Sequence, residues 1–233
     1  SFYYIGRAMD EETIQKHYKQ YGNTNLITDS GLANNVQIHA IGDSHSIFFH
    51  NSMKIYEHWG HIVTMYNFVK QGINLFNLGN ILGNGHEKYN IKMNDYVIFC
   101  YGYNDIQKHF FINYRSDIEI NIEKLINSYI EYILYLRNTY KITPIIPCIY
   151  PLPIKKTSLD IKGNDEERVK YTQITNKLLE TKCKEKGILF LNIYNDISKN
   201  NKINEKYTVD GVHIDYNNNE LRKYIETKIY ELI

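Results

Sequence analysis

From residue 36 onward, short apolar runs alternate with long amphipathic segments, and this alternation is what most constrains the fold of the 233-residue chain. The runs that read as strands lie at 36–41, 95–102, 143–151 and 188–194, and the helical patterns at 117–140, 165–187 and 217–233. Strands joined by helices require right-handed crossovers, which produce a parallel sheet with helices on both faces. We therefore expect an α/β domain.

Other segments are less regular. Residues 46–58 fit a helix, 61–68 form a short β-branched run, and 73–80 are apolar and end in Gly-Asn. Pro147 has no backbone N–H to donate to a sheet, so the strand that contains it is expected to be an edge or irregular strand. Residues 154–164 are expected to form a loop.

The first 35 residues have no strand pattern. Residues 10–22 read as one short helix that is acidic at its start and closed by Gly22, and 28–35 read as a loop. We expect residues 1–35 to be an N-terminal extension or the remnant of a linker, and residues 36–233 to be the catalytic domain. The chain is compatible with being a domain of a larger protein.

Composition excludes several functions. The net charge is +1 with no basic stripe, so we expect no nucleic-acid partner. No apolar run approaches the roughly 18 residues that span a bilayer, and no signal peptide is visible, which is compatible with a cytoplasmic or virus-associated location. Three widely spaced cysteines and histidines without ligand spacing predict no disulfide framework and no metal, and we expect no cofactor.

Polar clusters follow the expected strands. "GDSH" (42–45) follows the first, "GYND" (102–105) follows the strand at 95–102, and "DGVH" (210–213) lies after the last strand. The glycine of "LGN" (78–80) ends an apolar run. In parallel sheets, ligands bind outside the carboxyl ends of the strands, which is where all four clusters are expected.

Each cluster also has a structural explanation. Ser44 is a common helix N-cap residue, Asn104 fits an Asx-turn, and 209–213 contains the turn pair Asp-Gly. Any one of these explanations is acceptable for a single cluster. Four clusters at one end of one sheet are hard to explain as caps and turns alone.

Acyl transfer is the chemistry that these side chains fit. A serine hydroxyl such as that of Ser44 needs a base, which His213 provides near neutral pH, and Asp210 can orient the imidazole. The tetrahedral intermediate needs hydrogen-bond donors, for which the backbone N–H groups of Ser44 and Gly79 and the amide of Asn104 are candidates. His45 is next to Ser44 in sequence and points away from it, so it is a poor candidate for the base.

The order of these motifs resembles the SGNH hydrolase (GDSL esterase/lipase) superfamily over about residues 36–233. The resemblance implies a flavodoxin-like three-layer α/β/α sandwich with a central parallel sheet of about five strands. It also implies Ser44 as nucleophile, His213 as base, Asp210 as its acid, and an oxyanion hole formed by Ser44, Gly79 and Asn104.

The sequence departs from the family pattern in two places. His45 stands where a leucine usually follows Gly-Asp-Ser, and the glycine block, which Gly79 fits best by spacing, is the weakest match. The Gly-Asp-Ser-His start is similar to that of SGNH domains attached to proteins of polysaccharide and capsule biosynthesis. The candidate substrate-binding residues are Asp43, His45, Tyr103, Lys108 and His109.

The leading hypothesis is a serine esterase that hydrolyses small acyl esters, above all O-acetyl esters on carbohydrate. The substrate would be a small molecule or a glycan ester, because the expected site loops are rich in Asn, Lys, Asp, Tyr and His. An O-acyltransferase that uses the same triad, and a non-catalytic carbohydrate-binding or assembly module, are the alternatives. A flavodoxin-like nucleotide or flavin binder is disfavoured because no Gly-rich phosphate loop follows the first strand.

Overall fold

A computed structural model of the chain describes residues 36–49, 52, 55–59, 64–73, 75, 91–114, 116–154 and 161–233. The expected extension 1–35, including its helix at 10–22, lies outside these residues. Most of the apolar run 73–80 and part of the loop 154–164 lie outside them as well.

Five parallel strands form the central sheet, in the order β2-β1-β3-β4-β5. The strands are β1 (Ile38–Gly42), β2 (Ile55–Trp59), β3 (Tyr96–Cys100), β4 (Thr143–Pro147) and β5 (Leu189–Leu191). This is the flavodoxin-like strand order, in which the chain direction across the sheet reverses between β1 and β3. The predicted α/β class and the sheet of about five strands are therefore confirmed.

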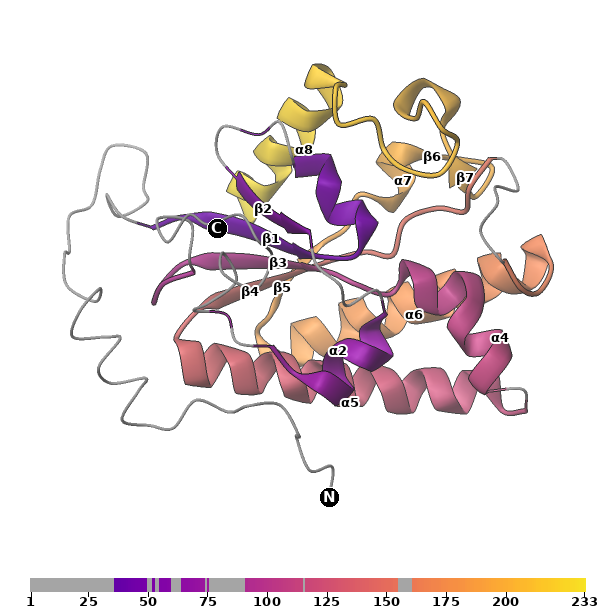
Figure 1. Cartoon of the computed structure of the whole chain (residues 1–233), viewed down its shortest axis with the longest axis horizontal. Coiled ribbons are helices and arrows are strands. Elements are labelled where there is room, and N and C mark those ends of the chain that lie inside the picture. The colour runs from indigo at the N-terminus through magenta and orange to yellow at the C-terminus, as the bar shows by residue number, and fades with distance from the viewer. Residues whose placement is uncertain are drawn as a thin grey trace.

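Helices cover both faces of the sheet (Figure 1). On one face lie α2 (Met65–Gln71), α5 (Ile118–Tyr140) and α6 (Asp165–Lys186), of which α5 packs against both others. On the other face lies α8 (Asn219–Leu232), which contacts β5. The three layers enclose one hydrophobic core, to which all five strands contribute buried side chains.

Local sequence explains where the long helices begin and end. The α6 helix starts with a capping box, in which the Asn164 side chain accepts from the Glu167 N–H at 2.9 Å and Glu167 accepts from the Asn164 N–H at 2.9 Å. It ends at Gly187, which adopts a left-handed φ of 61°. The three helices expected at 117–140, 165–187 and 217–233 are all present within two residues of these bounds.

The expected helix at 46–58 was wrong. The chain instead forms a 3₁₀ helix, η1 (Ser44–Phe49), followed by strand β2, which pairs residue by residue with β1. Within the β-branched run 61–68, residues 65–68 form the start of helix α2, and the Thr64 hydroxyl accepts from the Asn67 N–H at 3.0 Å and caps the helix. Residues 61–63 lie outside the described residues. At β2, pairing with β1 outweighs the local propensity for a helix.

Strand β4 is not an edge strand, contrary to the expectation drawn from Pro147. It lies between β3 and β5, and Pro147 is its last residue. The pairing with β3 ends at Ile145. The N–H of Cys148, the residue after Pro147, donates to the Leu191 carbonyl of β5 at 2.9 Å. Since successive N–H groups of a strand point to opposite neighbours, the missing N–H of Pro147 faces β3 beyond the paired region.

Short elements complete the chain around the carboxyl ends of the strands. They are a π-helical turn η4 (Asp105–His109), α4 (Phe110–Asn113), α7 (Tyr194–Ile197), the antiparallel pair β6 (Ser198–Lys199) and β7 (Lys202–Ile203), and the 3₁₀ helix η5 (Glu205–Tyr207). Among the described residues, no helix combines the length and the apolar character needed to span a membrane.

Gly42, the last residue of β1, permits a close approach of β1 to β3. It has a φ of 153°, and a Cβ placed there would lie 2.1 Å from the carbonyl oxygen of Cys100. Only glycine fits such a contact. The Asp43 N–H then donates to that same carbonyl at 3.0 Å, which fixes the direction in which the chain leaves the strand.

Candidate active site

The candidate site lies where the strand order reverses. Ser44 follows β1 after Asp43 and begins η1, Asn104 follows β3, and the segment from Asp210 to His213 lies between η5 and α8. This crevice at the carboxyl ends of the strands is where open α/β sheets bind ligands.

Ser44, His213 and Asp210 form one continuous series of hydrogen bonds. Nε2 of His213 lies 2.9 Å from Oγ of Ser44, and Nδ1 of His213 lies 2.6 Å from Oδ2 of Asp210. Because a carboxylate can only accept, Nδ1 carries the proton and Nε2 presents its lone pair to the serine hydroxyl. This is the arrangement that activates a serine nucleophile.

The turn that contains Asp210 also fixes its carboxylate. Its Oδ1 accepts from the N–H groups of Val212 and His213, both at 2.8 Å, and from the Thr208 hydroxyl at 3.2 Å. Partial burial acts to raise the pKa of Asp210, but the hydrogen bonds from the ring and N–H of His213 and from Val212 outweigh it and lower the pKa to about 2. Asp210 is therefore ionised wherever His213 can act as a base.

Asp43, rather than Ser44, caps the turn after β1. Its Oδ1 accepts from the His45 N–H at 2.9 Å, and its carbonyl accepts from the Ser46 N–H at 3.0 Å and the Ser46 hydroxyl at 2.9 Å. The capping role that the sequence suggested for Ser44 thus belongs to Asp43. The hydroxyl of Ser44 is left to face His213.

Asn104 does not use its side chain as a cap for η4. Its Nδ2 donates to Oδ2 of Asp43, with a long separation of 3.4 Å. Asp43 therefore contacts both the Asn104 amide and the N–H of His45, the residue after Ser44, which holds the amide close to Ser44. Gly79, the third expected oxyanion donor, lies outside the described residues, so the oxyanion hole stays a prediction.

Asp105 has a role that the sequence did not reveal. Its fully buried carboxylate accepts from the N–H groups of Met65 at 2.6 Å and Tyr66 at 3.3 Å, and so holds the first turn of α2 against η4. Burial raises the pKa of Asp105 to about 7, although these backbone hydrogen bonds act to lower it. Because Asp105 is the residue after Asn104, these hydrogen bonds also fix the backbone around Asn104.

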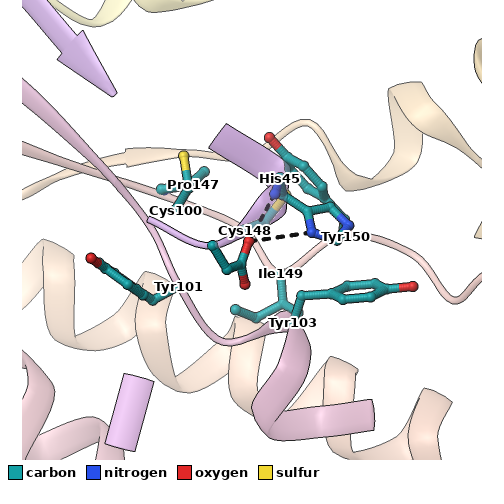
Figure 2. A pocket seen from close by; sticks show the side chains of 9 residues that line it. His45, Cys100, Tyr101, Tyr103, Pro147, Cys148, Ile149 and Tyr150 are labelled. Carbon is teal, nitrogen blue, oxygen red and sulfur yellow. Dashed lines mark hydrogen bonds and ion pairs between the residues drawn. The ribbon is translucent and has the colours of Figure 1, made fainter. Parts of the chain in front are cut away.

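Three of the proposed substrate-binding residues, Asp43, His45 and Tyr103, lie beneath the site with at most 5% of their surface exposed. The His45 ring lies beside Tyr150 and faces Tyr103, with ring centroids 5.1 and 4.0 Å apart (Figure 2). Nδ1 of His45 is 3.3 Å from Oδ1 of Asp43 but is not aligned for a hydrogen bond. Contact of Asp43, His45 and Tyr103 with substrate stays a prediction.

The other two proposed substrate-binding residues, Lys108 and His109, lie on η4. Lys108 is exposed, whereas His109 is half-buried, contacts Asn113 through Nδ1 at 2.8 Å, and packs on the Tyr66 ring at 4.6 Å. Burial lowers the pKa of His109. Neither residue lines the pocket next to Ser44.

Thr208 is a site residue that the sequence analysis missed. Besides donating to Asp210, its hydroxyl accepts from the Gly211 N–H at 2.9 Å. A threonine two residues before Asp-Gly is a recognisable turn residue, so this local signal was present in the sequence.

The described residues suggest neither metal nor disulfide chemistry. Within those ranges, no group of three or more His, Cys, Asp or Glu side chains is placed to hold a metal ion. Cys100, Cys148 and Cys183 are free and buried, as small hydrophobic residues are. Burial raises the pKa of Cys148 and of Cys183 to about 12, so neither is a ready nucleophile.

Comparison with known proteins identifies the fold. No protein-family model and no curated protein sequence matches the chain. The structure is similar to that of a GDSL-like lipase from Bacteroides thetaiotaomicron, with 18% identity and a TM-score of 0.55 over 93% of this chain and 98% of the lipase. It is also similar to a catalytic mutant of an acetylxylan esterase from Geobacillus stearothermophilus, with 12% identity and a TM-score of 0.51 over 83% of this chain and 94% of the esterase.

These identities are low, so the similarities establish a shared fold. The resemblance to SGNH hydrolases that the motif order indicated is confirmed at that level. The chain has the three-layer architecture of the GDSL-like structures, and its Ser44, His213 and Asp210 meet at the crevice that this architecture provides.

Proposed function

We propose that the chain is a serine esterase of the SGNH type, which hydrolyses small acyl esters, chiefly O-acetyl esters on carbohydrate, through an acyl-serine intermediate. The observation that carries the proposal is the series of hydrogen bonds from Ser44 through His213 to Asp210. A serine that only caps a helix has no need of an imidazole oriented by a carboxylate.

In the first half-reaction, Oγ of Ser44 attacks the ester carbonyl carbon while its proton passes to Nε2 of His213. The carbonyl oxygen becomes an oxyanion, which the Asn104 amide and the Ser44 N–H stabilise, with Gly79 as the expected third donor. When the intermediate collapses, the C–O bond to the alcohol breaks and the leaving oxygen takes the proton from Nε2. The acyl group stays on Ser44.

In the second half-reaction, water replaces the alcohol. His213 removes a proton from the water as the oxygen attacks the acyl carbon, and then returns a proton to Oγ of Ser44 as the carboxylic acid leaves. The side chain of His213 is 38% exposed, which gives water access to the acyl-enzyme.

Two observations support a short acyl group on a polar scaffold. The segment 196–216, which carries Asp210 and His213, is rich in Asn, Lys and Asp and offers few methylenes for a lipid chain. Each buried methylene contributes about 0.8 kcal/mol, so a site without a long apolar groove gains little from chain length. One protein with this fold acts on an acetylated polysaccharide, as its description as an acetylxylan esterase states.

Covalent labelling by a fluorophosphonate, measured by intact mass and peptide mapping, tests the proposal. We expect one adduct on Ser44 that is absent from Ser44→Ala and strongly slowed in His213→Ala. Acetate release from O-acetylated sugars should accompany it, and adding a free sugar acceptor should not divert the acetyl group. Absence of labelling would support the non-catalytic alternative, and acetyl transfer to the sugar would support the acyltransferase.

A further inference from the structure

A pocket opens beside Ser44 on the side of His213. Its cavity volume is about 130 Å³, below the range of about 300–1,000 Å³ typical of whole small-molecule sites, so it has room for part of a ligand. Its described lining consists of Ser44, His45, Phe48, Val209, Asp210, His213, Ile214, Asp215 and Tyr216. Besides His213 itself, five of these nine residues belong to the loop that carries His213.

The proposed reaction assigns this pocket to the alcohol part of the ester. The leaving oxygen must accept its proton from Nε2 of His213, so the alcohol lies against the His213 side of Ser44. The oxyanion lies on the side of Asn104, which donates to the buried Asp43. A pocket lined by both flanks of His213 therefore receives the alcohol rather than the oxyanion.

The lining combines a flat apolar surface with a hydrogen-bond acceptor. Tyr216 is 40% exposed and Val209 is 79% exposed, while Phe48 and Ile214 are buried. Asp215 is half-buried, and its Oδ1 accepts from the Asn217 N–H at 2.9 Å. A sugar ring matches this surface, since its C–H face packs on an aromatic ring while its hydroxyl groups donate to a carboxylate.

The charge of the pocket limits which sugars it can bind. Asp210 and Asp215 are acidic, and the described lining contains no Lys or Arg. Two neighbouring cations lie outside the lining: Lys206 lies over the Tyr207 ring at 4.5 Å, and Arg222 donates to the Tyr216 carbonyl at 3.0 Å and to Asn219 at 2.6 Å. The carboxylate of a uronic acid would be repelled by the two carboxylates of Asp210 and Asp215.

We propose that Phe48, Val209, Asp215 and Tyr216 form an alcohol subsite that binds a neutral or cationic sugar ring, with Tyr216 as the platform and Asp215 as the hydroxyl acceptor. This inference rests on the proposed esterase function and adds the class of alcohol. It also assigns specificity to residues outside the triad and the oxyanion hole.

Steady-state kinetics with three acetate esters test the subsite: an O-acetylated neutral methyl glycoside, the matching O-acetylated methyl uronate with a free carboxylate, and ethyl acetate. We expect Tyr216→Ala to lower the ratio of kcat/KM for the neutral sugar to that for ethyl acetate about tenfold, mainly through KM. Tyr216→Phe should restore the ratio, because the ring is retained. Asp215→Asn should reduce the preference for the neutral sugar over the uronate.

Tyr224→Ala is the matched control, since Tyr224 is also 40% exposed but lies on α8 outside this pocket. It should leave all three kcat/KM values unchanged. An unchanged sugar-to-ethyl ratio in Tyr216→Ala, or a wild-type preference for the uronate, would overturn the subsite even if Ser44 is labelled and ethyl acetate is hydrolysed. No labelling of Ser44 and no hydrolysis of any ester would instead overturn the esterase function itself.

Discussion

Nε2 of His213 lies 2.9 Å from Oγ of Ser44, although 169 residues separate the two in the chain. Ser44 is placed by the end of β1 and His213 by the loop that follows η5, so the contact exists only in the folded protein. The distance allows direct proton transfer between hydroxyl and imidazole.

The first prediction follows from this contact. Ser44→Ala and His213→Ala should each reduce ester hydrolysis by about 10⁴-fold or more, and the double variant should be little worse than either, because the two residues act as a unit. Ser44 begins η1 and His213 lies on a loop, both at the carboxyl ends of the strands and outside the hydrophobic core, so thermal melts should stay close to those of the wild type. Substantial hydrolysis by Ser44→Ala would rule out Ser44 as the nucleophile.

Asp210→Asn should lower kcat by roughly 10²–10⁴-fold while KM changes little. The amide would donate to Nδ1 of His213, which forces the proton onto Nε2 and removes the lone pair that accepts from Ser44. Oδ1 of the new side chain can still accept from the Val212 N–H, so the turn should persist. The same variant should also slow fluorophosphonate labelling, and labelling at the wild-type rate would argue against the assigned tautomer.

Asn104→Ala should lower kcat by about 10²–10³-fold with a small change in KM, because an oxyanion donor acts mainly in the transition state. The hydrogen bond from the Asn104 amide to Asp43 is long, at 3.4 Å, so little stability should be lost with it. The opposite pattern, a lower melting temperature with a normal kcat, would assign Asn104 to the turn alone.

Asp105 predicts a pH dependence of stability. Burial raises its pKa in the folded protein from the ordinary value of 3.8 to about 7, so the folded state favours the protonated form. This contribution to the free energy of unfolding is fully present below pH 3.8 and is lost as the pH rises to about 7. The opposite contribution of Asp210 is lost only as the pH falls from 3.8 to about 2.

Urea unfolding of the wild type and of Asp105→Asn between pH 4.5 and 8 checks this prediction. The free energy of unfolding of the wild type should fall across this range relative to that of the variant, which cannot ionise. Asn keeps one oxygen to accept the Met65 N–H, so the variant should fold. Parallel curves for the two proteins would mean that Asp105 is ionised throughout.

Gly42→Ala should destabilise the protein by more than about 3 kcal/mol, since the added Cβ would overlap the Cys100 carbonyl oxygen in the ladder between β1 and β3. Gly187→Ala is the matched control, because Gly187 also has a positive φ, of 61°, but a Cβ there meets nothing within 4 Å. Gly187→Ala should lower the free energy of unfolding by about 1–2 kcal/mol, the cost of a left-handed backbone conformation alone. Equal losses in the two variants would remove the argument for close approach at Gly42.

The sequence by itself predicted four of the five strands, β1, β3, β4 and β5, together with the three long helices and the motifs at the candidate site. Its periodicities and caps act over a few residues, as the capping box at Asn164 and the terminal Gly187 of α6 illustrate. The motif order pointed to Ser44, Asn104, Asp210 and His213 because strand ends of a parallel sheet share one edge.

Tertiary structure decided what depends on partners distant in the chain. Strand β2 replaced an expected helix because β1 supplies its hydrogen-bond partners, and the burial of His45 depends on the rings of Tyr103 and Tyr150. The hydrogen bond from the Met65 N–H of α2 to Asp105 joins residues 40 positions apart, and the contact of Ser44 with His213 joins residues 169 positions apart. Local sequence carries propensities and turns, whereas the free energy that fixes these contacts comes from packing and hydrogen bonds that form only when the whole sheet has assembled.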